Sequence, residues 1–148
     1  MSLADWLANK LIEPHRPSSK EIANLLQICD RDIATSQVAE LGTDWQLGIA
    51  YNAALQAGTA ALSAAGYRAK REGNHYRVIQ SLAFTIEADQ SIIRRFDKLR
   101  QKRNISDYER TDTVTESDAA AMLSIAKQLR RDVERWIRLN HPELAKDL

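Results

Sequence analysis

Six cationic side chains lie within the ten residues from 94 to 103, and Asp97 is the single anion among them. The segment then changes to a polar run that contains Asn104, Asp107 and Tyr108. A guanidinium donates planar pairs of hydrogen bonds that match phosphate and carboxylate groups. An amide and a phenol add further donors and acceptors beside it. This combination is suited to binding an anionic, aromatic or nucleotide-like group.

Helical geometry divides these cations into two groups. At about 100° per residue, Arg94, Lys98 and Lys102 fall opposite the apolar side of the helix, and we interpret them as a solvated face. Arg103 instead continues the apolar stripe, and Arg100 lies at its flank. The helix is predicted from residue 91 to about 104, and its apolar residues are Ile92, Ile93, Phe96 and Leu99.

An inward guanidinium must be hydrogen-bonded or paired, because burying an isolated charge is expensive. For Arg103 the sequence leaves three kinds of partner open: an acid of the same chain such as Asp44 or Asp107, a second subunit, or a phosphate. The helix is expected to end near residue 104, and loop ends presented by rigid helices often carry function. The candidate contacts to a nucleotide or RNA are therefore Arg100, Lys102, Arg103, Asn104, Asp107 and Tyr108.

The composition limits the class of protein. The chain has 148 residues, a formal net charge of +1 and one cysteine, Cys29. This length fits one domain, and the charge demands neither a nucleic-acid nor a membrane partner. No apolar run approaches the roughly 20 residues of a membrane span, and the N-terminus does not resemble a signal peptide. We expect a cytoplasmic protein in which Cys29 belongs to the core.

The elements that position these residues are predicted to be helices. Five Gly and three Pro are few, and good helix formers dominate the chain. Short connections between amphipathic helices favour antiparallel neighbours. We therefore predict an all-α fold, an antiparallel helical bundle of four to five main helices in one domain, 1–148. We predict a short helix at 2–12 within an N-terminal part, 1–17, that ends in a Pro-containing linker. The main helices are predicted from Ser18 or Ser19 to Gly42, from Thr43 or Asp44 to 65, from His75 to 86, from 91 to 104, and from Thr115 to Pro142.

Three segments, in this order and spacing, resemble the HEPN domains, a large group of helical bundles. They are "AYNAALQAGTAALSAAGY" at 50–67, "HYRVIQSL" at 75–82 and "LRQKRNISDYE" at 99–109. The first is similar to the Ala-rich central helix of that family, and its small side chains let a neighbouring helix approach closely. The last is similar to the Leu-Arg…Arg-Asn…Asp-Tyr signature of one bacterial branch. The resemblance covers about residues 40 to 140.

Many members of this family are metal-independent RNases whose motif is Arg, four to six residues, then His. Arg103 and Asn104 match the start of the motif, but the later positions hold Tyr108 and Arg110, and the next histidine is His141. RNA cleavage through the 2′-hydroxyl needs proton transfer near neutral pH, which suits His with a pKa near 6.5 better than Tyr near 10. The earlier His75 is in phase with apolar residues, and we interpret it as a packed or capping residue.

The resemblance therefore implies a non-catalytic or degenerate HEPN-type module. Such a module binds nucleotide or RNA, or pairs with a nucleotidyltransferase-like protein in a toxin–antitoxin or defence system, and we expect a homodimer. A metal-independent RNase and a purely structural protein-interaction bundle are the alternatives. No metal-ligand cluster or Gly-rich phosphate loop is present, so we predict no cofactor.

Overall fold

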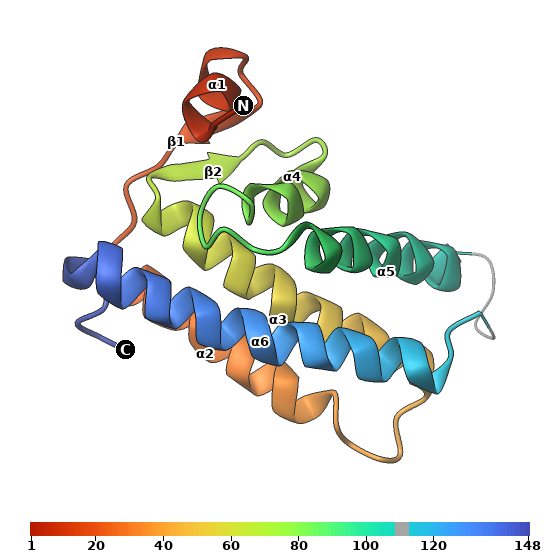
Figure 1. The fold of residues 1–148 in the computed structure, drawn as a ribbon. Helices are drawn as coiled ribbons and strands as arrows, with labels where there is room; N and C mark the ends of the chain where they lie inside the picture. The colour runs from red at the N-terminus through yellow and green to blue at the C-terminus, as the bar shows by residue number, and fades with distance from the viewer. Residues whose placement is uncertain (109–112) are drawn as a thin grey trace.

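The computed structural model describes residues 1–108 and 113–148, with side chains described for 1–104 and 113–148. It is mostly helical, which confirms the predicted all-α bundle (Figure 1). In chain order the elements are α1 (Leu3–Ala8), β1 (Ile12–Pro14), α2 (Ser19–Thr35), α3 (Thr43–Ala64), β2 (Tyr67–Ala69), α4 (Asn74–Ser81), α5 (Gln90–Tyr108), α6 (Glu116–Asn140) and a terminal 3-10 turn (Pro142–Leu144).

The helix α3 is the centre of the bundle. It packs against α2 and α6 along most of its length, and α4 and α5 contact it from the other side. In Figure 1, α2 and α5 run in the direction opposite to α3 and α6, so that helices following one another in the bundle are antiparallel. The short α1 lies at one end, and its Trp6 ring meets the Phe84 ring edge-on with centroids 5.1 Å apart.

Small side chains on α3 bring its neighbours close. Seven of its alanines and Gly58 are buried, as the stripe of small residues predicted. A Cβ placed on Gly58 would lie 2.9 Å from Val78 Cγ1 of α4, so this contact requires a residue without a side chain. Cys29 is fully buried in the same core, as predicted, and burial raises its pKa to about 12.

Side chains that begin the helices were largely predictable. Ser18 caps α2 by accepting from the Glu21 N–H, and Thr115 and Asp118 form a capping box at the start of α6. These contacts satisfy N–H groups that have no partner within the helix. The helix α3 begins at Thr43, one of the two predicted positions, but its N-cap is Gly42 and no side chain makes a cap hydrogen bond there.

Three other features differ from the expected segments. The linker after α1 contains β1, which pairs antiparallel with β2 through the register Ile12 with Ala69. The fourth helix ends at Ser81 rather than near 86. The helix α5 continues to Tyr108, so residues 105–108 are helical rather than irregular.

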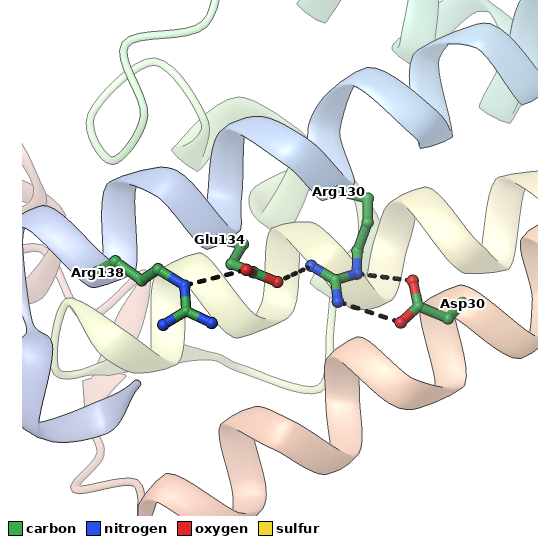
Figure 2. A network of polar contacts seen from close by, with 4 residues as sticks. All are labelled: Asp30, Arg130, Glu134 and Arg138. Carbon is green, nitrogen blue, oxygen red and sulfur yellow. Dashed lines mark hydrogen bonds and ion pairs between the residues drawn. The ribbon is translucent and has the colours of Figure 1, made fainter. Parts of the chain in front are cut away.

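An ion-pair network joins α2 to α6 on the face away from α5 (Figure 2). Arg130 donates two hydrogen bonds to Asp30, of 2.7 and 3.1 Å, and a third of 2.7 Å to Glu134. Glu134 also accepts from Arg138 at 3.0 Å. Hydrogen bonding from Arg130, opposed by burial and assisted by Arg138, lowers the pKa of Glu134.

None of the helices in the described part of the chain has the length and apolar character that a membrane span requires.

Candidate anion-binding pocket

An open pocket of about 400 Å³ lies where the start of α4 meets the second half of α5. Its lining residues come from two segments that are distant in sequence, 71–76 around the start of α4 and 100–104 in α5. Two arginines, two asparagines and a histidine supply most of its polar groups. Its lining residues are Arg71, Gly73, Asn74, His75, Tyr76, Arg100 and Asn104.

The first turn of α4 forms one wall of the pocket. Gly73 is the N-cap, with a φ of 66° in the left-handed region that glycine adopts at little cost. It has no side chain, so the start of the helix has no side-chain cap hydrogen bond. These N–H groups carry the partial positive charge of the helix, which favours an anion at this end.

Arg100 forms the opposite wall. Its Nε donates to Asp97 Oδ1 at 2.8 Å, and both side chains are mostly buried. Gln101 also donates to Asp97, at 3.1 Å, which fixes the carboxylate. Because Asp97 engages Nε, the Nη groups of Arg100 are the donors that a bound anion would meet. The guanidinium also lies 5.7 Å from the centre of the Tyr76 ring, within the range of a cation–π contact.

Arg103 lies behind the pocket rather than in its lining. Its guanidinium stands over the buried Tyr51 ring, 4.9 Å from the ring centre, and its Nη1 donates to Asn104 Oδ1 at 3.3 Å. The sequence predicted that the Arg103 side chain points inward, and its contact with the buried Tyr51 ring agrees with this direction. Asp107 was one of the acids that the sequence offered as a partner for Arg103, and its side chain lies outside the described residues.

His75 connects the pocket to the core. Its Nδ1 is 3.1 Å from the Tyr51 hydroxyl, and the ring is partly buried. Burial, followed by the charges of Arg103 and Arg100, lowers the pKa of His75. Burial raises the pKa of Tyr51 to about 12, although both arginines oppose this change. At neutral pH the imidazole is therefore uncharged and the phenol keeps its proton.

The six residues proposed from the sequence are placed differently. Arg100 and Asn104 line the pocket, and Arg103 supports it from behind. Lys102 is directed to α6, where its Nζ lies 2.6 Å from Asp118, and it does not line this pocket. Asp107 and Tyr108 belong to the end of α5, and their side chains lie outside the described residues.

Sequence reasoning missed the α4 side of the pocket. Arg71, Asn74 and Tyr76 were treated as part of a polar loop and a helix start, and His75 as a packed residue. The hydrogen bond to Tyr51 supports packing for His75, but the same side chain also lines the pocket. The local signal was a glycine followed by polar residues at a helix start, which is too common to single out a site.

A second cationic hollow, of about 510 Å³, lies along α6 at the network of Figure 2. It is lined by four arginines and Glu134, but Arg130 and Arg138 already bond to Glu134 and Arg130 also bonds to Asp30. Among residues 1–104 and 113–148, no acidic side chain lines the pocket beside α4, and the N-terminus of α4 adds to this pocket. We therefore regard the α4–α5 pocket as the stronger anion site.

No group of three or more His, Cys, Asp or Glu side chains within 1–104 and 113–148 is placed to hold a metal ion. Comparison of the chain with models of known families, with curated proteins and with solved structures gave no match. The resemblance to HEPN domains therefore stays a prediction.

Proposed function

We propose that the α4–α5 pocket binds a phosphate group of a nucleotide or of single-stranded RNA. The observation that carries this proposal is the meeting of Arg71, Arg100 and the start of α4, which has no side-chain cap, around one open space whose described lining residues include no acid. Arginine donors and a helix N-terminus each favour anions, and here they face the same volume. Asn104 supplies an amide beside them.

The nucleotide part of the proposal comes from Tyr76. This ring lines the pocket and is 42% exposed, so part of it is open to solvent. Exposed aromatic rings beside cationic grooves stack with the bases of single-stranded nucleic acids, at about 1–3 kcal/mol for each base. Arg77 and Arg100 lie near the ring, each 5.7 Å from its centre.

Calorimetric titration with uridine monophosphate and a short oligouridine, at low and high salt, tests the proposal. Arg100→Gln removes one charged donor and should weaken binding about 10- to 100-fold, since a hydrogen bond to a charged group is worth about 1.5–3 kcal/mol. Arg94→Gln is the matched control, because Arg94 is an exposed arginine of the same helix outside the pocket. Phosphate contacts should also weaken as salt rises. Equal affinities of the two variants would remove the proposal.

RNA cleavage is a second candidate function, and its support is that a histidine, His75, is among the residues that line the pocket. His75 lines the pocket close to two arginines, and Tyr51 engages its Nδ1, so Nε2 is the nitrogen left for a bound group. A neutral imidazole can take the proton of a 2′-hydroxyl that attacks the adjacent phosphorus, while the P–O5′ bond breaks and the departing 5′-oxygen takes a proton from water. The predicted products would carry 2′,3′-cyclic phosphate ends, and His75→Gln should abolish them. If the RNA stays intact after prolonged incubation, cleavage is excluded and binding is the remaining proposal.

The partners implied by the HEPN resemblance are proposals of the same kind. They comprise a second copy of the chain and a nucleotidyltransferase-like protein in a toxin–antitoxin or defence system. Light scattering of the purified chain tests the homodimer, and co-purification with the product of an adjacent gene tests the second partner.

A further inference from the structure

The pair formed by His75 and Tyr51 gives the pocket a group that can change its charge. Tyr51 is held in place by three contacts: its ring meets Phe96 edge-on at 5.6 Å, Arg103 stands over it at 4.9 Å, and its hydroxyl is 3.1 Å from His75 Nδ1. Because Tyr51 is buried in α3, it fixes the position of the imidazole at the wall of the pocket.

The described charges around His75 are mainly positive. From α5 it is faced by Arg100 and Arg103, which both act on its ionisation, and Arg71 lines the same pocket from the loop before α4. From α3 it meets the Tyr51 hydroxyl, which stays protonated, and Tyr76 follows it on α4.

The nearby carboxylate offsets only part of this charge. Asp97 is bonded to the Nε of Arg100, and it is not part of the pocket lining. With the pocket empty, the imidazole is therefore kept neutral by burial and by its cationic neighbours.

A bound anion reverses this balance. A phosphodiester against Arg71 and Arg100 would bring negative charge into the space that His75 lines, and the charged imidazole would then gain a partner. We propose that His75 takes up a proton when this pocket binds a phosphodiester, so that occupancy of the pocket is controlled by pH. This inference rests on the proposed function.

The direction of the effect follows from linkage. The pKa of His75 is lowered in the empty pocket and is raised by the anion, so the complex binds more protons than the free protein over the interval between these two pKa values. Affinity increases as pH falls through that interval, by up to about tenfold for each pH unit for one coupled proton. It is constant above the higher pKa and below the lower one.

The test uses 2′-O-methylated uridylyl-uridine as the probe. Its phosphodiester carries one charge at every pH used, so the ligand does not titrate, and its blocked 2′-oxygen prevents cleavage. Calorimetric titrations at about pH 5.5, 6.5 and 7.5, in buffers of different ionisation enthalpy, give the affinity and the number of protons taken up. His75→Gln keeps a polar side chain at the position but cannot titrate. His141→Gln, at the far end of α6, is the control.

We expect the wild-type protein and His141→Gln to bind several-fold more tightly at about pH 5.5 than at 7.5, with uptake of protons. His75→Gln should bind with the same affinity at each pH. Titration of the His75 ring resonances in the wild-type protein, with and without the probe, supports the same result without a variant and should show a higher pKa in the complex. Binding that does not depend on pH, or a pH dependence that survives in His75→Gln, would overturn the inference and leave the proposed function intact. Absence of binding at every pH would overturn both.

Discussion

The close contact between α3 and α4 can be tested with two glycines of the same helix. Gly58 meets α4, where an added Cβ would lie 2.9 Å from Val78 Cγ1 and 3.8 Å from Leu82 Cδ2. Gly48 lies ten residues earlier in α3, and an added Cβ there would meet nothing within 4 Å beyond its chain neighbours and the nearby backbone of its own helix. Replacing each by alanine therefore makes the same chemical change in a crowded and in an open position.

The two variants are expected to change stability in opposite directions. Both gain about 0.5–1 kcal/mol because alanine is the better helix former. At Gly58 this gain is opposed by overpacking, which costs about 1–3 kcal/mol in a well-packed core. Val78 is buried and branched at Cβ, so its methyl cannot move away easily. We predict that Gly58→Ala loses up to about 2.5 kcal/mol and that Gly48→Ala gains about 0.5–1 kcal/mol.

Urea unfolding followed by circular dichroism measures both free energies. Each kcal/mol should also move the melting temperature by about 2–4 °C for a chain of this size. Adding Val78→Ala to Gly58→Ala removes the crowding methyl, so the double variant should lose less stability than the sum of the single changes. If Gly58→Ala were as stable as Gly48→Ala, the proposed close approach of the two helices would be wrong.

Three other measurements address the ion pairs, the core and a helix cap. The hydrogen bond from Arg130 is the main cause of the lowered pKa of Glu134. The ionised Glu134 carboxylate therefore stabilises the fold above the ordinary pKa of a glutamate, and this stabilisation is lost as pH falls through the lowered pKa. Glu134→Gln should therefore be less stable than wild type near neutral pH and lose less stability on acidification, as urea melts at several pH values would show. Cys29, with a pKa of about 12 and full burial, should react with iodoacetamide far more slowly in the native protein than in urea. Thr115→Ala should lower the free energy of unfolding by about 1 kcal/mol, and Thr115→Ser should retain most of it.

Local patterns in the sequence were sufficient to predict the helices. The spacing of apolar residues located each long helix, and Thr115 with Asp118 marked the start of α6 because capping depends on side chains three residues apart. The extension of α5 to Tyr108 was missed because its last turn is polar, and polar residues in a helix resemble a loop when packing is unknown.

The pocket depended on tertiary contacts that spacing along the chain does not contain. Helical periodicity placed Arg100 at the flank of the apolar stripe, but nothing local connects it to Arg71 or His75. The absence of a histidine after Arg103 argued against proton-transfer chemistry. His75 of α4 lines the pocket and its Nδ1 meets the Tyr51 hydroxyl of α3, a contact that spacing along the chain does not reveal.

The central claim is that the start of α4 and Arg100 together hold a phosphodiester. Its most direct test follows the backbone amide resonances of residues 73–76 and the side-chain resonance of Arg100 Nε while 2′-O-methylated uridylyl-uridine is added. We expect saturable shifts at these positions that largely disappear in Arg100→Gln. Shifts confined to the arginines of α6, or no shift at saturating probe, would contradict it.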